Sequence, residues 1–512
     1  MLGGRLPARR EHESVIDLAR GTEKNAAFVF ATSRRLISHL PFLGFAMRLL
    51  QPCSLSLPVS PCLRSESGLS SHSPVGSAVG KRIVWGSIVA ALLFQPAIAE
   101  FAGRAGTDGG KAHGAENWPS WRGPKGDGVA AGKGYPTRWS KTENVAWKIA
   151  LPGKGSSTPV VWGERVFVTC GVDGKNTILC LDRNGKTLWN TAAGNETPGK
   201  HKKATGANPS AVTDGKHVYA YFKSGDLVCL DMDGKLVWQR NLQELFGKDT
   251  LWWDLGTSPV LTRGQVVVAV MHSGPSFVVA FDKASGQQAW KQDRNLDAPS
   301  EAAQSYSTPM VIEDGGRELL VVLGADHVTT HDAATGAELW RVGGLNPTGH
   351  QYFRSIASAV AADGIVVAPY ARGASLTGVR MGGSGDVTKT HVTWALEGLG
   401  ADVPTPAVAD GKVYLCTDKG DVSCLDLKTG KTLAKVALER NRNAYSASPI
   451  LAGGHLYLTR EDGKTFVLKA DTTLATVASN ELDGEFVVAT PVLVDGQVLI
   501  RTLDNLYCIG SK

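Results

Sequence analysis

The sequence predicts an all-β fold, an eight-bladed β-propeller built from four-stranded antiparallel blades. Three observations predict it: a turn motif recurs about every 50 residues, each repeat divides into four short strands, and one spare strand precedes the first complete repeat. The glycines of four successive motifs, Gly185, Gly234, Gly286 and Gly336, are 49, 52 and 50 residues apart. A period of this size is typical of propellers and other repeat architectures.

The repeat unit is clearest at residues 229–238, which read Cys-Leu-Asp-Met-Asp-Gly-Lys-Leu-Val-Trp. The aspartate can accept hydrogen bonds from turn amides, and the glycine supplies the positive φ that such a turn needs. A strand therefore precedes this turn and another follows it. A second pair of strands precedes each unit, so that four short strands make one blade.

A tryptophan closes most of the units and is too large to bury within one blade. With about 150–250 Å² to bury, it is expected to dock between neighbouring blades. The predicted docking residues are Trp147, Trp189, Trp238, Trp290, Trp340 and Trp394. Ala434 and Ala475 replace tryptophan in the sixth and seventh repeats, which predicts weaker docking there.

The ends of the repeat array predict how the ring closes. Eight strand starts are found, near Pro159, Pro209, Pro259, Pro309, Ala359, Pro406, Pro449 and Pro491. The last repeat stops after three strands, and residues 144–151 supply a lone strand with its own tryptophan. Closing the ring with that strand is how a propeller manages its edges. The fifth repeat departs from the pattern, because its turn before Trp394 is longer and lacks the Asp-x-x-x-Gly motif.

The formal charge of +6 comes entirely from the amino-terminal segment. Residues 1–99 hold 11 basic and 5 acidic residues, and the remainder holds 43 of each. The propeller therefore has no net charge, which argues against nucleic acid as a partner.

The eight cysteines do not form a metal or haem motif. No Cys-x-x-Cys pair is present, so no zinc site, covalent haem or other metal centre is predicted. Four of them occupy one repeat position in the third strand, where a small buried residue is expected: Cys180, Cys229, Cys424 and Cys508. A disulfide between Cys416 and Cys424 depends on the strand register.

The amino-terminal region divides into three predicted segments. Residues 1–78 lack a sustained period and are expected to be disordered or to precede the true translation start. Residues 79–99 combine two basic residues, an apolar run and an Ala-x-Ala site, which predicts a signal peptide cleaved between Ala99 and Glu100. The apolar run is shorter than the roughly 20 residues of a membrane span, although an uncleaved anchor is the alternative. Residues 100–143 are expected to cap the propeller of residues 144–512.

These features resemble the pyrroloquinoline-quinone-like (PQQ-like) repeat propellers of the quinoprotein alcohol dehydrogenase-like superfamily. The Asp-x-x-x-Gly-x-x-x-Trp repeat and the eight-blade count carry the resemblance over residues 144–510. That superfamily includes quinoprotein alcohol dehydrogenases, the outer membrane assembly scaffold BamB and sensor domains of some bacterial kinases. The segment Trp118-Pro-Ser-Trp-Arg-Gly-Pro and the terminal Leu506-Tyr-Cys-Ile-Gly are similar to those of a secreted, BamB-like group of planctomycete type.

The loops before the first strands meet on one face of a propeller and carry the candidate binding residues. These are Trp252, Trp253, Asp254, Tyr306, His350, Tyr352, Arg354, Arg372, Arg440, Arg442 and Tyr445. Aromatic and arginine side chains on rigidly framed loops suit an envelope protein, a peptide or a glycan, although any one of them can instead pack its own loop. The sequence thus predicts a non-catalytic, monomeric binding or scaffold propeller without a cofactor, periplasmic or secreted and at most peripheral to the membrane.

Two other functions are open. A PQQ-dependent dehydrogenase would need a calcium ion held by oxygen ligands and a carboxylate base, and Asp254, Glu301 and Asn208 lie on loops of the right kind. The adjacent cysteine pair that the resemblance implies for such enzymes is absent. An extracytoplasmic sensor propeller is the other alternative, acting here without a kinase motif in the same chain.

Overall fold

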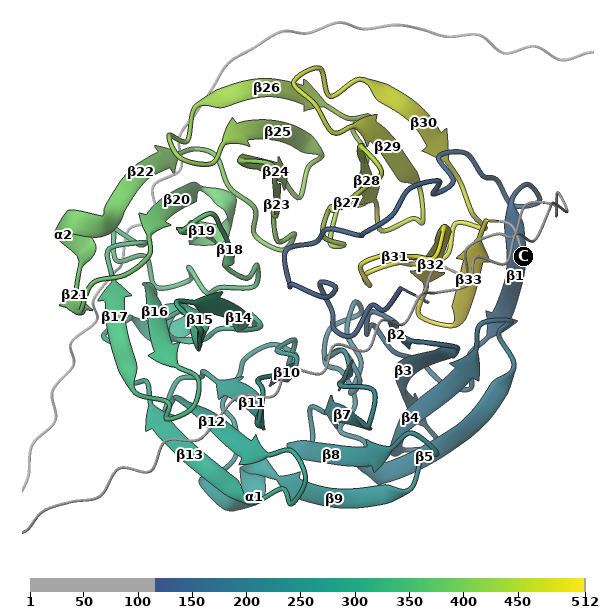
Figure 1. Ribbon diagram of the computed structural model, residues 1–512, viewed down its shortest axis with the longest axis horizontal. Helices are drawn as coiled ribbons and strands as arrows, with labels where there is room; N and C mark the ends of the chain where they lie inside the picture. Colours follow the sequence, from purple (N-terminus) through teal and green to yellow (C-terminus); the bar gives the residue numbers. More distant parts are fainter. Residues whose placement is uncertain (1–115, 511–512) are drawn as a thin grey trace, which may run out of the picture. The chain divides into compact units, whose positions relative to one another are not determined.

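The computed structural model of the chain describes residues 116–510. The predicted disordered segment, the signal peptide and its cleavage site at Ala99 and Glu100 lie outside the described residues. All described residues belong to the second of the two units into which the chain divides, residues 104–512. They form eight sheets arranged as the blades of a ring (Figure 1). The predicted eight-bladed propeller is therefore confirmed.

Blades one to four each run from a short inner strand to an outer fourth strand. Blade one contains β2 (Val160–Trp162), β3 (Arg165–Val172), β4 (Lys175–Asp182) and β5 (Thr187–Asn195). Blade two contains β6 (Val212–Thr213), β7 (His217–Tyr221), β8 (Asp226–Asp231) and β9 (Leu236–Asn241). Blade three contains β10 (Val260–Leu261), β11 (Gln265–Val270), β12 (Phe277–Asp282) and β13 (Gln288–Asp293). Blade four contains β14 (Met310–Asp314), β15 (Arg317–Gly324), β16 (His327–Asp332) and β17 (Glu338–Val342).

Blades five to eight repeat this order. Blade five contains β18 (Val360–Ala362), β19 (Ile365–Tyr370), β20 (Ser375–Arg380) and β22 (Val392–Glu397). Blade six contains β23 (Ala407–Ala409), β24 (Lys412–Cys416), β25 (Asp421–Asp426) and β26 (Thr432–Ala437). Blade seven contains β27 (Ile450–Ala452), β28 (His455–Thr459), β29 (Thr465–Lys469) and β30 (Thr476–Asn480). Blade eight contains β31 (Val492–Val494), β32 (Gln497–Arg501), β33 (Asn505–Ile509) and β1 (Val145–Ala150).

The eighth blade joins the two ends of the propeller. Its outer strand is β1, which pairs antiparallel with β33 and places Trp147 opposite Cys508. The predicted closure by the amino-terminal strand is thus confirmed. The helical elements are short: α1 (Leu242–Phe246), η1 (Ser300–Ala303), η2 (Ala371–Gly373) and α2 (Thr388–His391). Within residues 116–510, no helix has the length and apolar character that a membrane crossing requires.

The docking tryptophans pack on the turn glycine of the next blade. Trp238 of blade two donates from Nε1 to the Lys283 carbonyl oxygen at 2.9 Å, and its indole covers Gly286. Across the sheet it faces Cys229, whose side chain is fully buried and leaves room for the ring. Equivalent bonds join Trp147, Trp189, Trp290 and Trp394 to the carbonyls of Arg183, Met232, Ala333 and Leu427.

This contact predicts that Gly286 is required for two reasons. Its φ is +64°, a conformation that costs a side-chain-bearing residue about 1–2 kcal/mol, and an added Cβ would lie 2.4 Å from the Trp238 ring. Gly286→Ala is therefore expected to lower the free energy of unfolding by about 2 kcal/mol. Gly264→Ala in the same blade is the matched control, because no neighbouring atom lies within 4 Å of its added Cβ. Equal losses for the two variants in denaturant titrations would contradict the docking role.

The long turn of the fifth repeat adds a strand to blade four. β21 (Gly385–Asp386) pairs in parallel with β17, placing Gly385 beside Trp340 and Asp386 beside Arg341. Trp340 is 2% exposed, so this insertion covers the tryptophan in place of the missing turn glycine.

The register corrects one residue of the docking pattern. Ala434 does occupy the tryptophan position in blade six, opposite Cys424. In blade seven, however, Ala478 stands opposite Val467, whereas Ala475 lies before β30 and its carbonyl accepts from the Lys469 amide. The turn of this blade is one residue longer than in blade six and lacks the Asp-x-x-x-Gly motif, so no motif fixed the alignment of the strand that follows.

The six described cysteines are buried free thiols. Cys416 pairs with Val422 and Cys424 with Tyr414, so the two sulfurs are not cross-strand neighbours. Burial raises the pKa of Cys180 and of Cys229 to about 12. These side chains therefore act as small core residues.

Residues 116–143 cross the centre of the ring on the face seen in Figure 1. The backbone of Trp118 pairs with Val161 of blade one, and Val129 forms a parallel bridge with Leu451 of blade seven. Arg122 is 3% exposed and donates to the carbonyls of Pro449 and Pro406 at 2.9 and 2.8 Å. This crossing segment thus ties opposite sides of the ring together.

Candidate functional site

Eight hydroxyl side chains form a closed belt around the centre of the ring. Each blade supplies one serine or threonine just before its first strand, and its backbone N–H donates to the hydroxyl oxygen of the next blade's residue. The belt consists of Thr158, Ser210, Ser258, Thr308, Ser358, Thr405, Ser448 and Thr490, with N···O distances of 2.9–3.2 Å. The bond from Thr490 to Thr158 closes the circle. Because every blade is bonded to both neighbours, the belt fixes the walls of the central channel.

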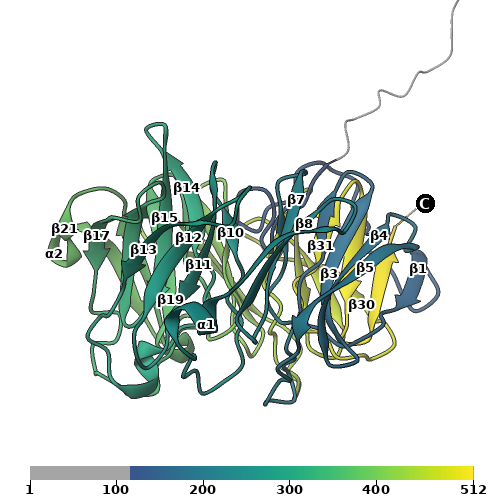
Figure 2. The same ribbon diagram turned by 90° about the horizontal axis from the view of Figure 1, so that it is seen from below.

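A funnel of about 220 Å³ leads from the loop face of the ring to this belt. The loop face is the one that carries α1, and the turn between β14 and β15 projects from the opposite face (Figure 2). Trp253, Asp254 and Tyr306 line the funnel, and Trp121 of the crossing segment forms part of its wall near the belt. Three of the predicted binding residues therefore share one cavity.

Trp252 and Trp253 are exposed on the rim of the loop face yet held firmly from beneath. They are 50% and 47% exposed. The Trp252 amide donates to Gln304 Oε1 at 3.0 Å, and the Trp253 amide donates to the Tyr306 hydroxyl at 3.2 Å. The Trp253 indole N–H donates to Glu301 Oε1 at 2.8 Å. The backbone of this pair and one indole are thus fixed while both rings face solvent.

Asp254 is a buried structural carboxylate. It accepts hydrogen bonds from Lys223 Nζ at 2.5 Å and from the amides of Lys200 and His201 at 2.8–2.9 Å. Burial alone raises the pKa of Asp254, but these hydrogen bonds, that of Lys223 first, outweigh it and hold the pKa below its usual value. The carboxylate is therefore charged and fully engaged, and it ties the loop before blade two to the loop before blade three.

Arg354 lies under the tryptophan pair and is already paired with two acids. Its Nε lies 3.3 Å from Glu301 Oε1, and its two terminal nitrogens lie 3.3 Å from the two Asp402 oxygens. Arg372 adds a longer contact of 3.9 Å to Asp402 and is half-exposed. The Arg354 guanidinium is buried and neutralised, so it supports the loop face and offers no free charge to an anion.

The remaining predicted binding residues lie outside the funnel. His350 stacks on Phe353 at 4.2 Å between ring centroids and meets the edge of Tyr352 at 5.7 Å, and both His350 and Tyr352 are exposed. These rings extend the aromatic surface of the loop face.

The last three predicted binding residues lie in the loop that follows blade six. Arg440 is exposed and forms an ion pair with Asp421 at 2.7 Å. Arg442 is exposed and makes no hydrogen bond or ion pair within residues 116–510. Tyr445 is 1% exposed and packs over Gly420, so it contributes to the core and not to the surface.

The oxygen-bearing side chains around the funnel do not fit a calcium ion. Calcium takes six to eight oxygen ligands, with carboxylates among them. Asp254 is saturated by Lys223 and two amides, and Glu301 is bonded to Trp253 and Arg354. Asn208 uses its side-chain oxygen for Thr205 and its amide for the Leu255 carbonyl. Within residues 116–510 no group of three acidic, histidine or cysteine side chains could hold a metal.

Neither the hydroxyl belt nor the position of Trp121 in the funnel wall was predicted from the sequence. A signal for the belt was present, because seven of the eight strand starts directly follow a serine or threonine, and the eighth, Pro209, directly precedes Ser210. Trp121 had no such signal, since its place near the channel depends on how residues 116–143 cross the ring.

The chain is similar to known proteins in sequence and in fold. The family model described as outer membrane protein assembly factor BamB matches residues 125–301 and 254–474. The outer membrane protein assembly factor BamB of Yersinia pestis is 24% identical over 357 residues, 67% of this chain and 81% of that protein.

Two solved structures show the same architecture. BamB from Moraxella catarrhalis is 15% identical, with a TM-score of 0.52 over 72% of this chain and 97% of that one. Quinohemoprotein alcohol dehydrogenase from Comamonas testosteroni is 14% identical, with a TM-score of 0.56 over 78% and 82%. At these identities the structural similarity establishes the fold and does not separate a scaffold from an enzyme.

Proposed function

The chain belongs to the family of the outer membrane protein assembly factor BamB, and from this premise we propose that it is a non-catalytic scaffold that binds a protein partner through its loop face. The observation that carries the proposal is the pair Trp252 and Trp253, two half-exposed indoles on a buried polar support. Tryptophan is among the residues that contribute most to protein interfaces. Exposed aromatic side chains on a prearranged frame lose little conformational freedom on binding, which favours affinity.

The buried groups around the funnel support binding over catalysis. Each carboxylate that could act as a base or a metal ligand is already bonded to a cation, as Asp254 is to Lys223 and Glu301 is to Arg354. Such pairs stiffen the loops that present the tryptophans. A scaffold needs this rigidity, whereas a general base needs a carboxylate free to take a proton.

The proposed setting is the cell envelope. With the predicted signal peptide, the chain would act in the periplasm or outside the cell, at most peripheral to the membrane. The proposed partner is a protein of outer membrane protein assembly, as the name of the relatives indicates. A peptide or a glycan on the same face would be the alternative outcome of the experiment below.

Co-purification from envelope extracts tests the proposal. Replacing both Trp252 and Trp253 by alanine is expected to reduce partner recovery at least about thirtyfold, since a central interface tryptophan contributes at least about 2 kcal/mol. Leu236→Ala is the matched control, because Leu236 is 56% exposed but lies on the outer strand of blade two. Equal recovery with the tryptophan variant and the control would refute the loop face as the binding surface.

A further inference from the structure

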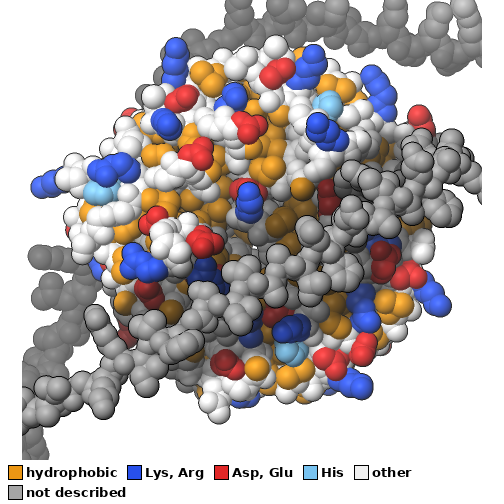
Figure 3. Space-filling model, viewed as in Figure 1, with side chains coloured by type: hydrophobic (Ala, Val, Ile, Leu, Met, Phe, Trp, Pro, Cys, Tyr) orange, Lys and Arg blue, Asp and Glu red, His pale blue; other side chains and the backbone are white. Residues whose placement is uncertain are grey.

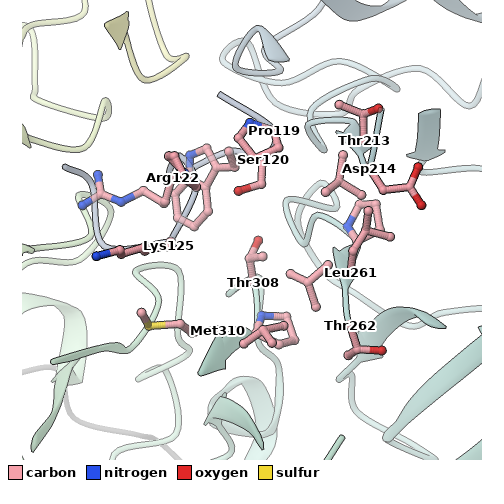
Figure 4. A pocket seen from close by; sticks show the side chains of 18 of the residues that line it. Pro119, Ser120, Arg122, Lys125, Thr213, Asp214, Leu261, Thr262, Thr308 and Met310 are labelled. Carbon is pink, nitrogen blue, oxygen red and sulfur yellow. The ribbon is translucent and has the colours of Figure 1, made fainter. Parts of the chain in front are cut away.

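A second cavity, of about 320 Å³, opens on the face that the crossing segment spans (Figure 4). The crossing segment forms one wall, and the inner ends of blades two to four form most of the rest. Its apolar lining includes Pro119, Trp121, Pro259, Leu261, Pro309 and Met310. This inner-edge pocket lies on the side opposite Trp252 and Trp253, so it is independent of the site in the proposed function.

The crossing segment shows how a polypeptide binds this inner edge. One position in each blade, three residues after the belt hydroxyl, turns its backbone toward the ring's centre. At this position Val161 bonds to Trp118 through both its N–H and its carbonyl, at 2.9 and 2.8 Å. Leu451 likewise donates to the Gly128 carbonyl and accepts from the Ala130 amide, at 2.9 and 2.8 Å.

Two further blades use the same position. The Thr213 amide of blade two donates to the Pro119 carbonyl at 3.0 Å, and the Val408 amide of blade six donates to the Asp127 carbonyl at 3.3 Å. The crossing segment therefore pairs with blades one and seven in the manner of an added strand and makes one backbone hydrogen bond to each of blades two and six. Its path leaves the inner edges of blades three and four uncovered.

Leu261 and Val311 occupy this position in blades three and four, and both line the pocket. Each is the counterpart of Val161: Leu261 pairs with Val266 and Val311 with Leu320, as Val161 pairs with Val166. Because antiparallel strands alternate bonded and non-bonded pairs, the backbone groups of Leu261 and Val311 point away from their own sheets and into the pocket. An extended peptide could bond to them as the crossing segment bonds elsewhere.

Basic side chains outnumber acidic ones in the lining of the pocket, which favours an acidic peptide. They are Arg122, Lys125, Arg263 and Lys283, against Asp214 and Glu318. Lys283 pairs with Asp214 at 3.3 Å, and Arg263 pairs with Glu313 at 2.8 Å. Lys125 is exposed at the rim and has no hydrogen bond or ion pair within residues 116–510. On the visible part of this face acidic and basic side chains are interspersed (Figure 3).

We propose that the inner-edge pocket binds an extended segment of a partner protein. The segment adds as a strand to Leu261 and Val311, places an apolar side chain among the prolines and Met310, and presents an acidic residue to Lys125. Backbone pairing supplies affinity, while the apolar cavity and the lysine supply selectivity.

Fluorescence anisotropy with the intact chain tests this site. The probe is a fluorescein-labelled nonapeptide of alternating valine and glutamate with phenylalanine at its centre. Saturable binding is expected, and Lys125→Glu should raise the Kd at least tenfold. Lys133→Glu is the matched control on the same segment, since Lys133 is also exposed but does not line the pocket, and it should leave the Kd within twofold.

A second variant separates strand addition from simple charge attraction. Leu261→Pro removes an N–H that the ladder with β11 does not use, so folding should persist while the Kd rises at least tenfold. Val311→Pro serves the same purpose if the first variant does not fold. The double alanine variant of Trp252 and Trp253 should bind the probe normally, which distinguishes the two sites.

Two results would overturn the proposal. One is equal affinity in the Lys125→Glu and Lys133→Glu variants. The other is no saturable binding by the intact chain.

Discussion

Replacing Asp254 by asparagine is expected to lower the free energy of unfolding by about 3–5 kcal/mol, the usual cost of removing one partner from a buried ion pair. The side chains of Asp254 and Lys223 are 2% and 8% exposed. In the variant, water therefore cannot solvate the charged lysine that has lost its partner. The backbone N–H groups of Lys200 and His201 donate to a carboxylate oxygen in the wild type, and in the variant they would also face the amide group of asparagine. Denaturant titration of the variant and the wild type measures the loss.

A surface pair provides the control for this variant. Arg263 and Glu313 form an ion pair at 2.8 Å, but their side chains are 61% and 64% exposed. Glu313→Gln should therefore cost less than about 1 kcal/mol. Similar losses for the two variants would mean that the buried pair does not hold the loops.

The contribution of Asp254 to the free energy of unfolding should also depend on pH. Its native pKa lies below the value of the unfolded chain, about 3.9, because Lys223 and two amides stabilise the charged form against the opposing effect of burial. The contribution is then complete above about pH 4 and is lost as the pH falls through the native pKa. The stability difference between wild type and Asp254→Asn should narrow at acidic pH, and a difference that grows below pH 4 would reverse the assigned sign.

Removing the Arg122 side chain is expected to cost at least about 3 kcal/mol, because two charge-assisted hydrogen bonds of about 1.5–3 kcal/mol each are lost. The guanidinium bonds to the Pro406 and Pro449 carbonyls, which follow the belt residues of blades six and seven. Burial lowers the pKa of Arg122 to about 10, against a smaller opposing effect of Asp127, so the group remains charged at neutral pH. Gly128 packs directly on this group, and an added Cβ would lie 2.1 Å from Nη2.

Arg138 on the same segment is the matched control for Arg122→Ala. It is exposed, and its guanidinium donates to the Val477 carbonyl at 3.1 Å. Arg138→Ala should change the free energy of unfolding by less than about 1 kcal/mol. Equal effects in denaturant titrations would show that Arg122 does not anchor the crossing segment.

The fold was readable from the sequence because its determinants are local and repeated. The turn aspartates and glycines and the docking tryptophans recur at fixed spacing, and each copy adds weight to the same interpretation. Where a repeat departs from the motif, the prediction of its strands is less accurate. The turn of blade seven lacks the Asp-x-x-x-Gly motif, and Ala475 was predicted in place of Ala478. The strand pairing of β21 with β17 had no sequence signal.

The site was readable only in part. Three residues predicted from the loops, Trp253, Asp254 and Tyr306, do line one cavity. What the sequence could not show was which charges are already satisfied. Arg354 was predicted to be a binding residue, but Glu301 and Asp402 lie beside it, from loops 53 and 48 residues away, and pair with its charge. Tyr445 resembled a surface aromatic but fills the core.

Photo-crosslinking from position 252 tests the scaffold function most directly. A benzoylphenylalanine at this position in growing cells should form a covalent adduct with a protein of outer membrane assembly, identified by mass spectrometry. The same group at position 236, equally exposed but on the outer strand of blade two, should form no such adduct. An adduct from position 236 alone, or none from position 252, would contradict the account of the loop face as the partner-binding surface.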